Sequence, residues 1–236
     1  MRNFNILGYS FSSYWSMLVI GAITVIVISI LRAKRYKISY VKALIMAFFV
    51  VVLGCLGAKM LYMIQNPASS FSWRGGMSLY GSVFLIPVGF VIISLMLRVR
   101  YAKCMDFIAV YGPLFFAVMR VGCYLNGCCG GIIIDFFGDY LVPPVQLIEC
   151  ALDVAIMAFL LWRERNIKTF GFQYPIFMVS YSGIRFFIEF IRNTQKIYCF
   201  LSEGQWISIF TFVMGLCILL FLFKEEKNYE KYKINN

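Results

Sequence analysis

Seven long apolar stretches alternate with short polar segments along the chain, at about residues 14–31, 41–63, 77–97, 104–124, 145–162, 170–191 and 206–223. At a helical rise of about 1.5 Å per residue, each is long enough to cross about 30 Å of hydrocarbon. Backbone groups find no partner in lipid, so each stretch is expected to be a helix. The pattern predicts an all-α fold, a polytopic integral membrane bundle of seven transmembrane helices in a single transmembrane domain over residues 1–236.

Lys and Arg residues follow a two-sided pattern across these stretches. The linkers after the first, third and fifth stretches, together with the C-terminal tail, hold 15 of them, whereas the N-terminus and the other linkers hold 4. Because cytoplasmic loops carry the excess of Lys and Arg, we predict that the N-terminus is outside and the C-terminus cytoplasmic. Residues 224–236 then form a charged cytoplasmic tail. A signal peptide is the weaker interpretation of the first stretch, since its basic cluster follows it.

Composition supports a membrane protein and restricts its chemistry. The 236 residues are 61% hydrophobic and 14% charged, whereas soluble domains carry about 25% charged residues. The chain contains no histidine, which excludes histidine bases, histidine metal ligands and histidine proton switches. The Lys and Arg residues that give the net charge of +11 lie between the apolar stretches and not along one face of a soluble domain. No nucleic-acid partner is therefore expected.

Among the ionisable residues within the apolar stretches or at their outer ends are Lys59, Arg120, Glu149, Asp153, Arg185 and Glu189. A charge at helix-centre depth costs about 2.5–3.5 kcal/mol, so such residues suggest a functional site. Glu189 follows Arg185 by four positions, a spacing that also suits a structural ion pair. The sequence names no partner for Glu149 or Asp153. Three cations near the outer side repel one another unless an anion joins them, so we expect an anionic ligand.

Four polar motifs interrupt the aliphatic background. They are Arg74-Gly75-Gly76-Met-Ser-Leu-Tyr80-Gly81, Arg120-Val-Gly122-Cys123-Tyr-Leu-Asn126-Gly127-Cys128-Cys129, Pro143-Pro144-Val-Gln146-Leu-Ile-Glu149, and Tyr181-Ser-Gly-Ile-Arg185-Phe-Phe-Ile-Glu189-Phe-Ile-Arg192. Paired glycines at a helix N-terminus let backbone N–H groups approach an anion. Small residues in membrane helices also allow close helix packing, so each motif alone is weak.

Taken in this order, the motifs resemble those of the prolipoprotein diacylglyceryl transferase family. Weaker matches are Tyr14, Gly57-Ala-Lys59 and Gly204-Gln205-Trp-Ile-Ser208. The resemblance implies a multi-pass enzyme of the bacterial cell membrane that moves the diacylglyceryl group of phosphatidylglycerol to the lipobox cysteine thiol of a preprolipoprotein. It implies phosphatidylglycerol, the preprolipoprotein signal peptide and the lipid bilayer as partners, and no cofactor.

The chain departs from the family pattern where acid–base chemistry is expected. Tyr80 stands at the family's histidine, Cys123 at its asparagine and Cys128 at its glutamate, while Pro143 and Ile148 replace a histidine and a tyrosine. The alternative is therefore an altered or inactive homologue that binds anionic phospholipid or modifies a different acceptor. A seven-helix receptor or transporter would not account for the arginine motifs.

The resemblance and the chemistry together predict a site. The catalytic residues are predicted to be Arg120, Arg185, Tyr80 and Tyr181. The substrate-binding residues are predicted to be Tyr14, Lys59, Gly75, Gly76, Gly122, Cys123, Asn126, Gly127, Gln146, Glu149 and Glu189. Guanidinium groups bind phosphate through two parallel hydrogen bonds, so Arg120 and Arg185 would hold the phosphate and offset charge on the leaving group, with Lys59 as a third cation. Tyr80 would position the substrate or relay a proton.

The cysteines Cys123, Cys128 and Cys129 allow several interpretations. Without histidine, a metal site would need a carboxylate or another sulfur such as Cys199 as its fourth ligand, and no metal ligand is assigned from the sequence. A disulfide would persist on the outer side. The thiols are also able to pack as small hydrophobic groups, or one of them to carry an acyl or glyceryl group.

Overall fold

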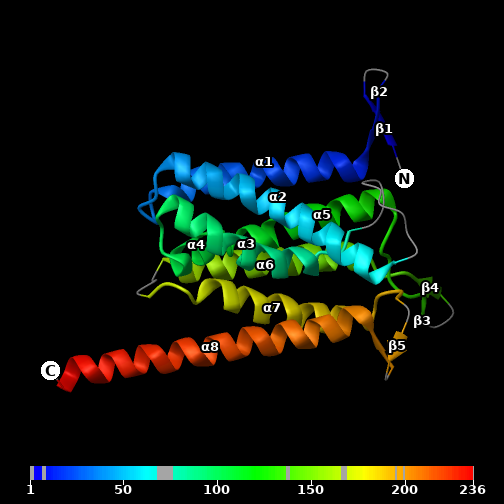
Figure 1. Ribbon diagram of the computed structural model, residues 1–236. Helices are drawn as coiled ribbons and strands as arrows, with labels where there is room; N and C mark the ends of the chain where they lie inside the picture. Colours follow the sequence, from blue (N-terminus) through cyan, green and yellow to red (C-terminus); the bar gives the residue numbers. More distant parts are fainter. Residues whose placement is uncertain are drawn as a thin grey trace.

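The computed structural model describes residues 3–6, 9–67, 77–136, 139–165, 169–194, 196–198 and 200–235. Within these ranges the chain forms the helices α1 (Ser13–Ala33), α2 (Tyr40–Gln65), α3 (Tyr80–Leu97), α4 (Tyr101–Ile108), α5 (Tyr111–Asn126), α6 (Val145–Glu164), α7 (Gln173–Ile188) and α8 (Glu203–Asn235). The predicted helical bundle is confirmed (Figure 1).

In the part of the chain that the structure describes, six helical segments are long and apolar enough to cross a membrane: Ser16–Ala33, Tyr40–Gln65, Tyr80–Leu97, Tyr101–Asn126, Val145–Glu164 and Glu203–Lys227. They account for six of the seven predicted stretches. The remaining stretch contains α7, which is 16 residues long. A polytopic membrane protein is therefore established, while the seventh crossing stays a prediction.

Small antiparallel hairpins add to the helices, and the prediction of an all-α fold did not include them. The strand pairs are β1 (Asn3–Ile6) with β2 (Tyr9–Ser12), β3 (Ile134–Phe136) with β4 (Asp139–Leu141), and β5 (Lys196–Tyr198) with β6 (Leu201–Ser202). In the first two pairs the register places Ile6 opposite Tyr9 and Phe136 opposite Asp139. The strands are too short to give an apolar signal of membrane length, so a search for such stretches passes over them.

A break divides the fourth apolar stretch into α4 and α5, where a single helix was predicted. Pro113 follows the break in the first turn of α5. A proline lacks an N–H and its ring clashes with the carbonyl four residues earlier, here Ala109 in the break. The local sequence thus explains the interruption.

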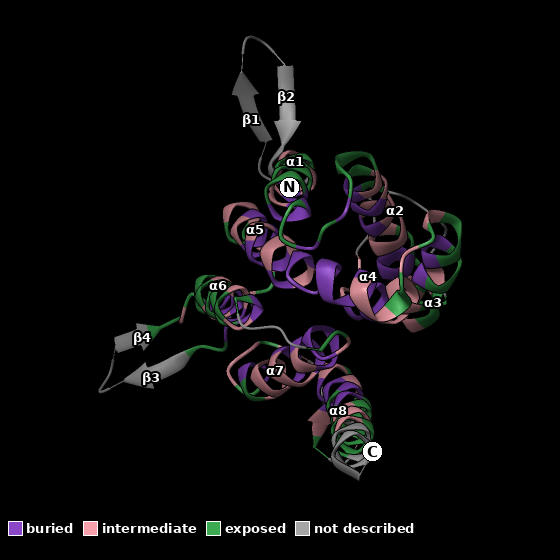
Figure 2. Ribbon diagram, turned by 90° about the vertical axis from the view of Figure 1, so that its left-hand side faces the viewer, coloured by how far each residue is buried: buried purple, intermediate pink, exposed green. Residues whose placement is uncertain are grey.

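Apolar side chains cover the outside of the bundle, as expected of helices in lipid. Leu31, Ile64 and Leu95 are each 73% exposed, a fraction that would be costly in water. Figure 2 shows buried residues on the inward faces of the helices and exposed residues on the outer faces. The interior, by contrast, contains charged and hydrogen-bonding groups such as Asp106, Arg120 and Gln173.

The two ends of the bundle differ in structure and charge. The hairpins β1–β2, β3–β4 and β5–β6 lie at one end, and the C-terminus lies at the other (Figure 1). We call these the hairpin end and the basic end, because the chain leaves α1, α3 and α6 at the latter through Arg32, Arg98 and Arg163. There Arg32 Nη2 lies 2.7 Å from Glu164 Oε2 in a buried ion pair between α1 and α6.

Two glycines allow α2 and α3 to cross in close contact. A Cβ at Gly57 would meet the backbone of Gly81, and a Cβ at Gly81 would meet the backbone of Gly57. Next to this crossing, Ser78 N donates a hydrogen bond to Ala58 O at 2.9 Å. Small residues let membrane helices approach in this way. The crossing fixes the start of α3, where Tyr80 lies, at the hairpin end.

Candidate active site

Three arginines and two glutamates meet at the hairpin end of the bundle. Arg120 lies in the last two turns of α5, Glu149 near the start of α6 and Arg185 in the last turn of α7. Glu189 follows α7 as its C-cap, and Arg192 comes three residues later. Arg120, Glu149 and Glu189 are buried, and the side chains of Arg185 and Arg192 are only 11% and 12% exposed. We call Arg120, Arg185 and Arg192 the arginine cluster.

Glu149 is the centre of this arrangement. Arg120 Nε lies 2.6 Å from Glu149 Oε2, and Arg185 Nη1 pairs with Glu149 Oε1. Arg185 Nη2 lies 2.9 Å from Glu189 Oε2, which confirms the ion pair suggested by their spacing. Arg192 Nη1 lies 3.9 Å from an oxygen of each glutamate. Three guanidinium groups therefore share two carboxylates in direct ion pairs, and the charges of Arg120 and Arg185 also act on the buried Asp153. Guanidinium groups that have no carboxylate of their own favour a further anion.

The start of α8 holds Glu189 in place. Ser202 Oγ donates a hydrogen bond to Glu189 Oε1 at 3.1 Å. Ser202 N donates to Gln205 Oε1 at 2.9 Å, and Gln205 N donates to Ser202 Oγ at 3.2 Å, a reciprocal capping of the helix N-terminus. A Cβ at Gly204 would lie 3.0 Å from Glu189 Oε1. The Gly204-Gln205 motif thus supports the carboxylate.

Tyr80 and Tyr181 lie side by side but differ in hydrogen bonding. Their ring centroids are 5.8 Å apart. Tyr80 OH lies 2.5 Å from Ser208 Oγ, and Ser208 Oγ donates to Gly204 O at 2.7 Å. A serine hydroxyl has one proton, so Tyr80 is the donor in the first bond. The buried Tyr181 OH has no hydrogen-bond partner among the described residues, and a ligand would supply the one it lacks.

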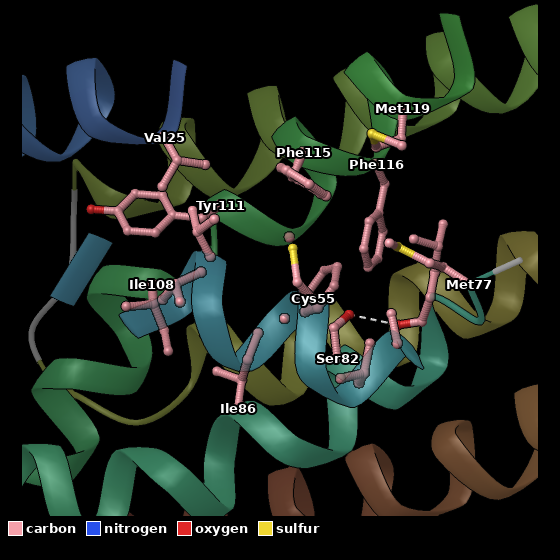
Figure 3. Close-up of a pocket in the computed structure, with 18 of the residues that line it drawn as sticks. Val25, Cys55, Met77, Ser82, Ile86, Ile108, Tyr111, Phe115, Phe116 and Met119 are labelled. Carbon is pink, nitrogen blue, oxygen red and sulfur yellow. Dashed lines mark hydrogen bonds between the residues drawn. The ribbon is translucent and has the colours of Figure 1, made fainter. Parts of the chain in front are cut away.

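An apolar pocket adjoins the charged site. Its walls come from α1, α2, α3, α4, α5 and α7, and include Val25, Cys55, Ile86, Phe115 and Phe116 (Figure 3). The Ser82 hydroxyl in its wall donates to Leu79 O at 2.5 Å, so that group is already satisfied. Phe116 also contacts Tyr181, with ring centroids 4.8 Å apart, and Tyr181 is close enough to Arg120 and Arg185 for their charges to act on it. Tyr181 therefore connects the pocket with the arginine cluster, and together they suit an amphipathic anion.

The cysteines of the second motif lie where α5 ends. Gly127 has a φ of 70° and reverses the chain, and Cys128 N then donates to Cys123 O at 3.1 Å. Gln146 Nε2 donates to Cys128 O at 2.7 Å from the start of α6. Beyond the helix, a hydrogen bond from Cys123 and the charges of Arg192 and Arg120 lower the pKa of Cys129 to about 5. Burial raises the pKa of Cys128.

Other predicted site residues have contacts within the fold. A Cβ at Gly122 would lie 3.0 Å from Met17 Cβ, so this glycine permits α1 and α5 to pack. Asn126 Nδ2 lies 3.9 Å from Cys128 Sγ. Lys59 is buried in α2, with Nζ 5.1 Å from the Tyr62 ring centroid. The side chain of Tyr14, and both Gly75 and Gly76, lie outside the described residues.

Arg192 and Ser202 are the residues that the sequence did not assign to the site. Arg192 ends the fourth motif, but the pattern of Lys and Arg residues along the chain places it in a linker between two apolar stretches. Yet Arg192 reaches both glutamates, and its Nε is buried without a hydrogen-bond partner among the described groups. Its place in the motif was the available signal. Ser202 was detectable as the first residue of a capping pattern with Gln205.

The fold and site define a multi-pass membrane protein with a buried cationic site beside an apolar pocket. A family model described as prolipoprotein diacylglyceryl transferase matches residues 2–221. A relative named phosphatidylglycerol–prolipoprotein diacylglyceryl transferase 2, from Clostridium perfringens, is 30% identical over 90% of this chain and 91% of its own. Relatives named phosphatidylglycerol–prolipoprotein diacylglyceryl transferase occur in Clostridium tetani, at 24% identity over 91% of this chain and 94% of theirs, and in Bordetella parapertussis, at 31% over 69% and 68%.

The chain belongs to the prolipoprotein diacylglyceryl transferase family, a family of transferases. Its described residues include six helices long and apolar enough to cross a membrane, and its relatives are bacterial, so it is a multi-pass protein of the bacterial membrane.

Proposed function

We propose that this protein transfers the diacylglyceryl group of phosphatidylglycerol to the lipobox cysteine of preprolipoproteins. The observation that carries the proposal is the arginine cluster beside an apolar pocket. A phospholipid offers the matching pair of groups, a phosphate for the guanidinium groups and acyl chains for the pocket. The names of the relatives specify phosphatidylglycerol and a prolipoprotein as their substrates.

The reaction needs few proton transfers from the protein. The thiolate sulfur attacks the glyceryl carbon next to the phosphate, a C–S bond forms, and the C–O bond breaks with its electron pair left on glycerol phosphate. The thiol proton goes to water. A thiol of pKa about 8.5 is partly ionised at neutral pH, and nearby cations lower that value. A strong base such as the missing histidine is then dispensable.

The arginine cluster would act on the leaving group. Guanidinium groups stay charged and bind phosphate in the plane of their N–H groups, so they offset the negative charge that grows as the C–O bond breaks. Arg120 and Arg185 are held by Glu149, which fixes their orientation. Arg192 is less tightly paired, at 3.9 Å from its carboxylates, and adds an N–H for the phosphate.

The two tyrosines take different parts in this proposal. Tyr181 OH, buried and without a described partner, would donate its hydrogen bond to the phosphate beside Arg120 and Arg185. The Tyr80 proton is engaged by Ser208, so Tyr80 acts as a positioning residue. Lys59, Gly75 and Gly76 would complete the approach to the anion, with Tyr14 at the start of α1.

We further propose that α7 is the seventh crossing and that the hairpin end faces outside. The excess of Lys and Arg at the other end supports this orientation. Residues 1–236 then form one transmembrane domain, with residues 224–236 as a cytoplasmic tail that continues α8 as far as Asn235. A lipobox cysteine would reach the site from outside, while the lipid enters laterally.

A pair of arginine variants tests the proposal. Arg120→Lys keeps the charge but loses the planar donor set, so transfer to a lipobox peptide should fall by about 10²–10³-fold. Arg32→Lys is the matched control, because Arg32 is equally buried and pairs with Glu164 at the basic end. It should alter stability with near wild-type transfer. Equal transfer by both variants would remove the phosphate-binding role of Arg120.

A further inference from the structure

Three sulfur atoms converge beside the arginine cluster. The Sγ atoms of Cys123, Cys128 and Cys129 all lie within 4.8 Å of one another. The three residues come from one short segment but differ in environment, since Cys123 is buried and Cys129 is exposed. The proposed transfer reaction uses none of these thiols.

The backbone turns sharply to bring the sulfurs together. Gly127, with a φ of 70°, ends α5 and sends the chain back over its own last turn. Cys129 then adopts a φ of 60°, a left-handed conformation that is unfavourable for a non-glycine residue and is concentrated at functional sites. Asn126 Nδ2 and Cys123 O lie 3.9 and 3.6 Å from Cys128 Sγ.

Neighbouring segments hold this turn in place. Gln146 Nε2 donates to Cys128 O at 2.7 Å from α6. After α7, Asn193 N donates to Gly130 O at 3.1 Å, and Ile132 N donates to Ile191 O at 3.0 Å. A Cβ at Gly131 would lie 2.8 Å from Pro143 Cγ. The cysteine segment is thus positioned from both sides before any ligand binds, as metal sites require.

We propose that Cys123, Cys128 and Cys129 bind one thiophilic metal ion of the Zn²⁺ type, with water in the fourth position. A metal–sulfur distance of about 2.3 Å in tetrahedral geometry separates two sulfurs by about 3.8 Å, within the observed spread. A disulfide would use two of the three sulfurs and leave the third without a role.

Charge around the sulfurs suits the bound ion. Three thiolates and one divalent cation carry a net charge of −1. Arg120 and Arg192 lie near enough for their charges to act on Cys129, so they would offset it. The exposed Cys129 gives the ion a route from solvent. Once bound, the ion would fix the end of α5, the helix that carries Arg120.

The test uses the full chain, purified under reducing, oxygen-free conditions, treated with a chelator and then supplied with Zn²⁺ or Co²⁺. Elemental analysis after desalting should give about one ion per chain. The Co²⁺ form should show thiolate-to-metal charge-transfer absorption, and titratable thiols should fall by three and return on chelation. Cys129→Ser should weaken binding by at least about 10-fold. Cys217→Ser, at an exposed position in α8, should bind as the wild type does.

Three outcomes would overturn the proposal. One is wild-type protein, folded by circular dichroism and with its thiols reduced, that retains no ion. Another is equal metal binding by Cys129→Ser and Cys217→Ser. A third is the loss of two thiols without metal, reversed by a reductant and not by a chelator, which would identify a disulfide. Cys128→Ser repeats the comparison at a half-buried position if Cys129→Ser does not fold.

Discussion

At the scale of single residues, the site depends on how many partners each charged group has. Glu149 is shared by Arg120, Arg185 and, at 3.9 Å, Arg192, so no guanidinium group has a carboxylate to itself there. A buried ion pair with matched charges is a structural element. An excess of charge of one sign favours the binding of a ligand that carries the opposite charge. The Tyr181 hydroxyl, which has no hydrogen-bond partner among the described residues, is placed to contact the same ligand.

The tyrosine hydroxyls provide a residue-scale prediction. Tyr181→Phe removes a group with no described partner, so it should leave stability unchanged. It should lower the rate of lipid transfer at least about 10-fold, which corresponds to about 1.4 kcal/mol of free energy. Tyr80→Phe should cost about 0.5–1.5 kcal/mol of stability, because it breaks the Ser208 bond, with a smaller effect on rate. Unfolding midpoints and initial rates of the two variants measure both quantities.

A third tyrosine is the control for this comparison. Tyr36 OH is buried and donates to Asp106 O at 3.3 Å at the basic end, away from the arginine cluster and the apolar pocket. Tyr36→Phe should lose stability and keep its transfer rate. If Tyr181→Phe behaves like Tyr36→Phe, the Tyr181 hydroxyl has no part in binding the substrate.

Some of these contacts could be predicted from the sequence and others could not, for a physical reason. The Arg185–Glu189 pair follows from helical spacing and was predicted. The pairs of Glu149 with Arg120 and Arg185 join α5, α6 and α7, and pairs between helices depend on packing that one sequence does not specify. Arg192 was missed for the same reason. Arg192 lies beyond the end of α7, where its contacts depend on the direction that the chain takes after the helix.

At the scale of elements, the helices were predictable from apolar length, and their interruptions were not. The observed α1, α2 and α6 end within a few residues of the predicted stretches. The break before α5 follows from Pro113. The hydrophobicity of a whole stretch of membrane length does not show the effect of one proline. The hairpins carry little apolar length, so only their local alternation, as in Tyr9-Ser-Phe-Ser, would have indicated strands.

The crossing of α2 and α3 gives an element-scale prediction. Gly81→Ala places a methyl group against the backbone of Gly57, so the helices must separate, at a cost of about 1–3 kcal/mol. Because Tyr80 is adjacent, transfer activity should fall as well. Gly54→Ala on α2 is the matched control, since its Cβ would meet its nearest neighbour at an ordinary 3.8 Å. Thermal unfolding in detergent compares the two, and equal midpoints would show that the crossing tolerates separation.

At the scale of the whole molecule, the two ends of the bundle differ in role, since one holds the candidate site and the other holds structural contacts. The hairpin end holds the arginine cluster, the tyrosines and the cysteine segment, whereas the basic end is held by the Arg32–Glu164 pair and by Asp106, whose carboxylate accepts hydrogen bonds from Gly171 N and Gln173 N at the start of α7. From the Lys and Arg residues alone, the sequence predicts that the basic end is cytoplasmic, because that bias is set by membrane insertion and not by packing.

Reporter fusions on either side of α7 test the proposed topology. Alkaline phosphatase fused after Arg165, between α6 and α7, should be inactive because that linker is predicted to be cytoplasmic. The same enzyme fused after Phe200, between α7 and α8, should be active outside the cell. Equal activity from both fusions would mean that α7 does not cross the membrane, and the opposite pattern would reverse the orientation.

This chain carries tyrosine and cysteines where the motifs of its family carry other groups, and we propose that it still transfers a diacylglyceryl group. Mass spectrometry of a lipobox peptide incubated with the purified protein and phosphatidylglycerol measures this transfer. We expect addition of one diacylglyceryl mass to the peptide cysteine, with glycerol phosphate released in equal amount and both lost in Arg185→Ala. An unmodified peptide, from folded protein that still binds the lipid, would contradict it and favour an altered or inactive homologue.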